Sequence, residues 1–154
     1  MMRNSGTIPI QTITFVDPPQ VQHEMLAGDI PLYWISGGVE PVLHLEMIFR
    51  AGRGQERQRA VSHATAALIS EGTAGMNSRQ IAEQMDFYGA TLRVTTGVDA
   101  MSVSLYCMSR MLKPTLELLT DLLVSATFPE EELAIYKQNR IQKIRIAMEQ
   151  NETI

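Results

Sequence analysis

Residues 61–73 read VSHATAALISEGT and contain one histidine, His63, in a segment with a helical pattern. This raises the question of whether His63 belongs to a zinc site. A helical zinc site takes ligands at i and i+4, because such residues share a face, and it needs an acid to take a proton from bound water. The inverted motif H-x-x-E-H supplies all three from one turn. Here those positions read HATAA, with His63 first, Ala66 in place of the acid and Ala67 in place of the second histidine. Methyl groups neither bind zinc nor move protons, so this helix offers one candidate ligand.

The three histidines of the chain are far apart in sequence. Catalytic zinc takes three protein ligands plus water, so a lone histidine on a helix is more often a packing or surface residue than a ligand. We therefore interpret His63 as an ordinary helix residue and keep a metal ligand as the alternative. His23 and His44 lie in or beside strand-like segments, and we expect both to be structural or exposed.

Composition narrows the classes of function. The chain has 154 residues, of which 45% are hydrophobic, and this suits one globular domain with a sizeable core. The net charge of −4 argues against nucleic acid or an anionic membrane as the main partner, since both select basic surfaces. The single cysteine, Cys107, lies in the apolar run VSLYCM, which predicts a buried reduced thiol rather than a catalytic one.

The N-terminal sequence MMRNSGTIPIQTITFVDPP shows no targeting signal. It lacks the charged start, apolar core and small-residue cleavage site of a secretory signal. The longest apolar runs are also shorter than the roughly 20 residues that a membrane helix needs. We therefore expect a cytoplasmic protein without a membrane partner.

The residue pattern predicts an N-terminal arm, residues 1–21, followed by one folded domain, residues 22–154. Hairpin or alternating strand patterns predict a sheet from residues 23–38, 41–50 and 90–108. Helical patterns are found at about residues 59–71, 77–89, 111–126 and from 127 onward.

Two of these helices carry specific local signals. Asn77 and Gln80 have the spacing of a capping box, and Gly89 follows as a natural helix stop. In the third helix, leucines recur on one predicted apolar stripe, namely Leu112, Leu116, Leu119 and Leu123.

The order of elements is strands, two helices, a hairpin and two more helices. This order is typical of a segregated α+β fold and not of alternating βαβ units. Because the strands alternate and the helices show single apolar stripes, we predict an antiparallel or mixed sheet with helices packed mainly on one face. Residues 22–36 are expected to supply its edge strand.

Several segments, taken in order, resemble a known family. AGRGQE is similar to the family's A-G-S-R-x-E turn, HATAA follows in place of H-x-x-E-H, and EGT comes at the family's distance. Further along, IAEQMDFYGA resembles a helix ending in Gly-Ala, TTGVDAMSVSLYC a Thr-x-x-Asp hairpin, and FPEEELAIYKQNR the later helix. Residues 20–154 thus resemble the N-terminal core of the insulinase/pitrilysin zinc metallopeptidases, which include the mitochondrial processing peptidase subunits.

The resemblance implies a metallopeptidase-like core that is incomplete within 154 residues. It also implies that a distal glutamate would complete a zinc site within RIQKIRIAM, residues 140–148, where Ile144 stands and no acid occurs. Glu149 is the nearest carboxylate, but EQNET resembles the segment after that glutamate, so we interpret Glu149 as a solvated acid at a helix end. The residues that face His63 are expected to come from 140–148.

The degenerate positions are His63, Ala66, Ala67 and Ile144. The resemblance therefore implies a non-catalytic member without a catalytic residue, metal ligand or cofactor of its own, zinc being the cofactor of catalytic relatives. Such a chain would pair with an active zinc-peptidase subunit and help to enclose peptide substrates. Two alternatives stay open. One is a zinc-dependent metalloendopeptidase whose ligands are completed by another segment or chain, and the other is a structural core subunit of a larger complex.

Overall fold

The computed structural model describes residues 17–151, which fall into two units that divide between Glu40 and Pro41. In the first unit, β1 (Gln22–Leu26) and β2 (Ile30–Trp34) form an antiparallel hairpin. Its turn needs positive φ angles, which Gly28 supplies at 79° and Asp29 at 58°. The predicted hairpin is confirmed. The prediction that residues 22–36 supply an edge strand of the main sheet is wrong, because these two strands pair with each other in a sheet of their own.

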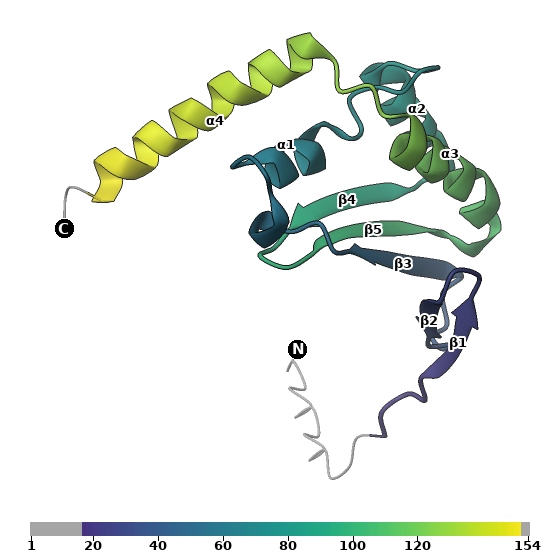
Figure 1. The fold of residues 1–154 in the computed structure, drawn as a ribbon. Coiled ribbons are helices and arrows are strands. Elements are labelled where there is room, and N and C mark those ends of the chain that lie inside the picture. The colour runs from purple at the N-terminus through teal and green to yellow at the C-terminus, as the bar shows by residue number, and fades with distance from the viewer. Residues whose placement is uncertain (1–16, 152–154) are drawn as a thin grey trace, which may run out of the picture. The chain divides into compact units, whose positions relative to one another are not determined.

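The second unit is built on a three-stranded antiparallel sheet in the order β3-β5-β4. Its strands are β3 (Val42–Phe49), β4 (Thr91–Thr96) and β5 (Met101–Met108). Its helices are α1 (Val61–Leu68), α2 (Ser78–Tyr88), α3 (Leu112–Ser125) and α4 (Glu130–Asn151). The helices lie over the same side of the sheet (Figure 1). The predicted α+β class, with helices mainly on one face, is confirmed.

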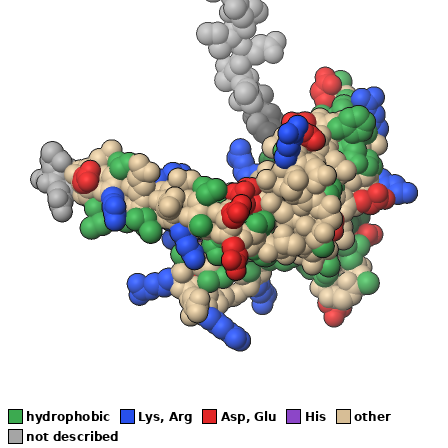
Figure 2. All heavy atoms as spheres, turned by 90° about the horizontal axis from the view of Figure 1, so that it is seen from above, with side chains coloured by type: hydrophobic (Ala, Val, Ile, Leu, Met, Phe, Trp, Pro, Cys, Tyr) green, Lys and Arg blue, Asp and Glu red, His purple; other side chains and the backbone are tan. Residues whose placement is uncertain are grey.

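The α4 helix extends from the rest of its unit as an arm (Figure 2). In its first turns Glu132, Leu133 and Tyr136 are partly buried, whereas every residue from Lys137 to Gln150 is exposed. Among the described residues, no helix is both long and apolar enough to cross a membrane.

Strand β5 shows how the sequence pattern places the core. Its alternate residues Met101, Val103, Leu105 and Cys107 are buried, whereas Tyr106 is exposed on the other face. Against the buried face pack apolar side chains of α2 and α3, namely Ile81, Met85, Leu118, Leu119 and Leu122.

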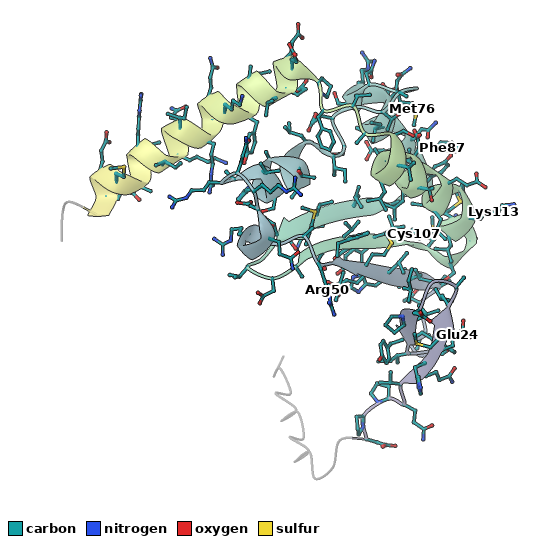
Figure 3. The ribbon with its side chains drawn as sticks, viewed as in Figure 1. Glu24, Arg50, Met76, Phe87, Cys107 and Lys113 are labelled. Carbon is teal, nitrogen blue, oxygen red and sulfur yellow. The ribbon has the colours of Figure 1, made fainter. Side chains whose placement is uncertain are left out.

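Cys107 lies on the helix-covered side of β5 (Figure 3) and is 4% exposed. Burial raises the pKa of its thiol, and a hydrogen bond with Thr115 opposes this only in part. Because the thiolate is the reactive form, we expect a thiol reagent to label the native protein far more slowly than the unfolded protein at the same pH. Rapid, stoichiometric labelling of the native protein would contradict this prediction.

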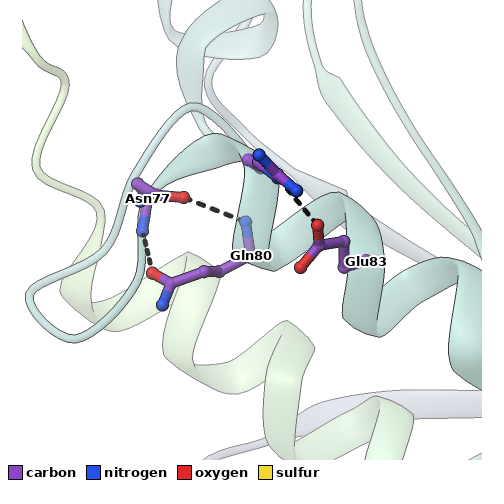
Figure 4. Close-up of polar contacts among 4 residues, drawn as sticks. Asn77, Gln80 and Glu83 are labelled. Atoms are coloured by element: carbon purple, nitrogen blue, oxygen red, sulfur yellow. Dashed lines mark hydrogen bonds and ion pairs between the residues drawn. The ribbon is translucent and has the colours of Figure 1, made fainter.

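The start of α2 confirms the predicted capping box (Figure 4). The Asn77 side chain accepts a hydrogen bond from the Gln80 amide at 3.0 Å, and the Gln80 side chain accepts one from the Asn77 amide at 3.0 Å. Two amides without partners inside the helix are thereby satisfied. Gly89 ends the helix with a positive φ of 60°, as its position predicts.

Candidate functional site

The α1 helix, which carries His63, begins under a glutamate cap. Ala60 precedes it with a φ of 72°, and its methyl side chain makes no capping hydrogen bond. Glu56 takes this role. Its carboxylate accepts hydrogen bonds from the amides of Ala60 at 2.9 Å and Ser62 at 2.8 Å, and from the Ser62 hydroxyl. The negative charge of this carboxylate also stabilises the helix, because the N-terminal end of a helix dipole is positive.

These hydrogen bonds lower the pKa of Glu56, the Ser62 hydroxyl being the largest cause. A carboxyl with a lowered folded-state pKa stabilises the fold above its unfolded-state pKa, and the effect disappears as pH falls through the folded value. We therefore expect Glu56→Gln to lower the urea midpoint at pH 7, with the difference from the unmodified chain shrinking well below pH 4.5. A difference that stays constant over this range would show that the carboxylate charge does not hold α1.

The turn before α1 is fixed by the hairpin between β4 and β5. The amide of Arg53 donates to the Gly97 carbonyl at 3.0 Å, and the amide of Gly54 donates to the Val98 carbonyl at 2.8 Å. On the other side of the turn, the Thr96 hydroxyl donates to the Ser62 hydroxyl at 3.1 Å. Segments around residues 54, 62 and 97 therefore form one hydrogen-bonded support that sets α1 against β4.

On this support, α1 and β4 enclose a small hollow of about 310 Å³. One wall consists of His63, Ala66 and Ala67, and the other of residues 94–96. The structure thus brings together three of the four degenerate positions. The sequence spacing alone predicts this shared face, since residues three and four apart are neighbours on a helix.

The fourth position, Ile144, does not line this hollow. The residue that meets His63 is Tyr136, whose hydroxyl lies 3.3 Å from His63 Nδ1. The prediction that a residue of 140–148 faces His63 is therefore wrong at this contact. Ile144 is 47% exposed, and at 1.5 Å of rise per residue it lies roughly 12 Å farther along α4 than Tyr136.

This arrangement does not fit a zinc ion. A helix face with one imidazole and two methyl groups, met by a tyrosine, supplies one of the three protein ligands that catalytic zinc takes. Within residues 17–151, no group of three or more His, Cys, Asp or Glu side chains is placed to hold a metal. The other two histidines in the part of the chain that the structure describes each stack on a tyrosine ring. The ring centroids are 4.1 Å apart for His44 and Tyr106 and 6.0 Å apart for His23 and Tyr33.

A larger hollow of about 730 Å³ lies beside α1 and was not predicted from the sequence. Its walls are mostly apolar and include Phe49, Val61, Ile69, Met101 and Leu123. These residues come from two strands, α1, its C-terminal end and α3, so no local pattern indicated that they meet. The Glu56 carboxylate at this hollow is engaged in capping α1, and we assign no chemistry to it.

Comparison with known proteins adds three findings. Residues 42–153 match the family model described as insulinase, peptidase family M16. A crystal structure of a peptidase M16 inactive domain from Pseudomonas fluorescens is similar over 78% of this chain and 30% of that one, with 27% identity and a TM-score of 0.72. A protease from Helicobacter pylori is similar over 83% of this chain and 31% of that one, with 15% identity and a TM-score of 0.71.

The second likeness bears on the fold alone, because the identity is low. No curated protein matches the chain. The chain spans 30% and 31% of the two solved structures, so it corresponds to less than a third of either.

Proposed function

Because the chain belongs to the insulinase family, peptidase family M16, we propose that it is a non-catalytic member of that family. In this role it pairs with an active zinc-peptidase chain and helps to enclose peptide substrates. The chain supplies scaffold and contact surface, and the partner supplies the zinc and the reacting groups. The cytoplasmic location stays a prediction of the sequence.

One observation carries this proposal, the composition of the α1 face. His63 keeps the first ligand position, but Ala66 and Ala67 stand at the positions of the acid and the second histidine, within the same hollow. The His63 ring is hydrogen-bonded to Tyr136 from α4. An enzyme that hydrolyses peptides with zinc needs both several ligands and a proton acceptor beside the bound water, and this face has neither group.

The similarity to the Pseudomonas fluorescens structure also supports the proposal, because that protein is described as an inactive domain of the same family. Retention of the fold without the site is understandable on physical grounds. The core of β5, α2 and α3 does not include His63, Ala66 or Ala67, so loss of the ligands leaves the packing intact.

The first test is zinc content and activity of the purified chain. We expect protein prepared without chelator to contain no stoichiometric zinc and to leave an unfolded peptide intact. Stoichiometric zinc that is lost in His63→Ala would contradict the proposal and favour an enzyme whose ligands are completed by another segment or chain.

The second test is pairing. An H-x-x-E-H chain of the same family from the same source is expressed with and without this chain, and peptide hydrolysis is measured at equal zinc. We expect the two chains to copurify and the pair to hydrolyse peptides faster than the active chain alone. Copurification without any effect on hydrolysis would instead indicate a structural subunit.

A further inference from the structure

The α3–α4 junction, residues 125–129, is held by the turn that follows α1. The amide of Thr127 donates to the Gly72 carbonyl at 3.0 Å, and the amide of Ala74 donates to the Ser125 carbonyl at 3.1 Å. These two hydrogen bonds are here called the junction clamp. A Cβ atom on Gly72 would lie 2.9 Å from Thr127 Oγ1, so the two segments also approach each other closely. The clamp therefore joins the end of α1 to the start of α4.

One residue of the junction has a strained backbone. Phe128 has a φ of 48°, in the left-handed region that a residue with a bulky side chain rarely adopts. Pro129 follows it and restricts its backbone further. Such a conformation persists only where the surrounding contacts hold it. The clamp on the preceding residue, Thr127, supplies such contacts, so weakening of the clamp relieves strain and lets α4 turn about Phe128.

Two acids flank the clamp. Glu71 directly precedes Gly72, and Glu132 lies in the first turn of α4. Both side chains are partly buried, and neither forms an ion pair within residues 17–151. Burial raises the pKa of Glu71 above its usual 4.5, and the charge of Glu132 raises it further. The two ionised carboxylates therefore repel each other across the contact that the clamp holds together.

The other groups around Glu71 do not offset this repulsion. Glu71 lines a hollow of about 460 Å³ together with residues of α2 and β4. Among the described residues that share this hollow, the charged one is Asp86 of α2, which is also an acid. From α4, Glu132 is the group whose charge acts on Glu71. Protonation of Glu71 or of Glu132 removes the repulsion between them.

We propose that the α3–α4 junction is a pH-sensitive hinge. When Glu71 and Glu132 are both ionised, their repulsion weakens the junction clamp, and α4 turns about Phe128. When Glu71 takes up a proton, the repulsion ends and the clamp closes in the arrangement described. This inference goes beyond the proposed function and does not rest on it, because it involves neither zinc nor a second chain.

The hinge controls how α4 lies against α1 (Figure 1). Glu132 and Tyr136 are four residues apart and share one face of α4. The Tyr136 hydroxyl meets the His63 ring, so a turn of α4 about Phe128 moves this hydroxyl relative to the ring. Closing of the hinge therefore fixes the contact of α4 with the face of α1 that carries His63.

The first test follows the clamp by amide hydrogen exchange in the purified chain. A carboxyl with a raised pKa in the closed form favours that form below its usual pKa, and the preference is lost as pH rises through the raised value. At pH 7.5 we expect Glu71→Gln to raise the protection of the Thr127 and Ala74 amides by about two- to fivefold, the scale of one exposed charge interaction. At pH 4 the variant and the unmodified chain should differ by less. Equal protection of the two proteins at pH 7.5 would overturn the proposal.

The matched pair of variants is Glu131→Gln and Glu132→Gln. Each removes one charge from the first turn of α4 and loses the same favourable interaction with the helix dipole, but Glu131 is exposed. We expect Glu132→Gln to raise clamp protection at pH 7.5 and to bring the pKa of Glu71, followed by its carboxyl ¹³C signal, down toward the usual value. Glu131→Gln should do neither. Equal effects of the two variants would overturn the proposal.

The double variant Glu71→Gln/Glu132→Gln tests whether the two acids act on each other. Each single change already removes the repulsion, so the second change should add little to clamp protection. Additive effects would mean that each acid acts alone, and the proposal would fail.

Spin labels test whether α4 turns. Cysteines replace the exposed residues Gln84 of α2 and Lys137 of α4 and carry nitroxides, and the buried Cys107 is changed to alanine. We expect the distribution of distances between the labels to be broader at pH 7.5 than at pH 4. At pH 7.5, Glu71→Gln should narrow it, and so should 0.5 M NaCl, which screens charges beyond a few ångströms. A distribution of the same width under all these conditions would show that α4 does not turn and would overturn the proposal.

Discussion

Gly52→Ala is expected to destabilise the folded chain by at least about 3 kcal/mol, the upper range of overpacking costs, and to lower the melting temperature by roughly 10 °C. The reason is a close approach of two backbones. A Cβ atom on Gly52 would lie 2.3 Å from the Val98 carbonyl oxygen, 2.5 Å from the Ala100 nitrogen and 2.5 Å from the Asp99 carbonyl carbon. Backbone atoms of a hairpin cannot rotate aside as a side chain does, so the turn itself must shift.

The control for this prediction is Gly75→Ala in the same unit. A Cβ atom at Gly75 meets nothing within 4 Å, and its φ is not positive. We expect this variant to be as stable as the unmodified chain or slightly more stable, since alanine lowers the entropy of the unfolded chain. Equal urea midpoints for the two variants would show that the turn does not pack on the β4–β5 hairpin.

The effect of Gly52→Ala should extend to α1. The turn that holds Gly52 is bonded to Gly97 and Val98, and it leads within four residues to Glu56, the cap of α1. If the turn moves, the capping carboxylate moves with it. Gly52→Ala and Glu56→Gln should therefore be non-additive, the double variant being less destabilised than the sum of the two single effects.

Local periodicity predicted the secondary structure of the second unit well, and the reason is physical. In β4 and β5 every second residue must be apolar for one face to be buried, and this pattern is visible over a few residues. The cap of α2 depends on Asn77 and Gln80, which are only three positions apart. Features of this kind are determined within one turn or one hairpin, so the sequence alone reveals them.

Helix faces were predicted less well. The predicted stripe of α3 does pack against the core, with Leu119 buried and Leu112, Leu116 and Leu123 partly buried. The other buried residues of the helix, Thr115, Leu118 and Leu122, lie beside this stripe and not on it. Thr115 can be buried because its hydroxyl donates to the Met111 carbonyl at 2.6 Å. In a helix this rich in leucine, several faces are apolar, and the tertiary contacts select among them.

Contacts between distant segments could not be predicted from local patterns. His63 and Tyr136 are 73 positions apart, and nothing in the spacing of α4 distinguishes Tyr136 from its apolar neighbours. Likewise, the hairpin pattern of residues 23–38 predicts two strands but not which sheet they join, because the pairing of strands with a distant sheet depends on long-range contacts. The sequence spacing therefore predicts that His63, Ala66 and Ala67 share one face of α1, but not which residue of α4 meets His63.

We expect that three substitutions can create a zinc site on the α1 face, and that the position of the third ligand depends on where α4 crosses α1. Adding Ala66→Glu and Ala67→His rebuilds the acid and the second ligand on one turn of α1, where the backbone already places these positions on the wall of one hollow. The site then needs a third protein ligand from α4. The structure points to position 136, because the Tyr136 hydroxyl already lies 3.3 Å from the His63 ring.

We expect Ala66→Glu/Ala67→His/Tyr136→Glu to bind one zinc ion per chain, measured by calorimetry and by metal analysis after gel filtration. The matched variant Ala66→Glu/Ala67→His/Ile144→Glu changes the same number of residues and adds the same charge. It should bind at least about tenfold more weakly, because loss of a supporting group alone costs 10–100-fold in metal affinity and loss of a ligand costs no less. In both variants His63→Ala should lower the affinity further.

The comparison between these two variants tests the position of α4 as well as the degenerate site. Tight binding by the Ile144→Glu variant and not by the Tyr136→Glu variant would mean that α4 crosses α1 about two turns farther along than described. If neither variant binds zinc while both keep native helix content, the α1 face lacks the geometry of a zinc site and not only its ligands. Zinc binding by the Tyr136→Glu variant would show that the backbone of α1 and α4 retains the geometry of a zinc site. The absence of zinc binding in the unmodified chain would then be due to three side chains, because adding the acid, the second histidine and the α4 ligand would be enough to bind the ion.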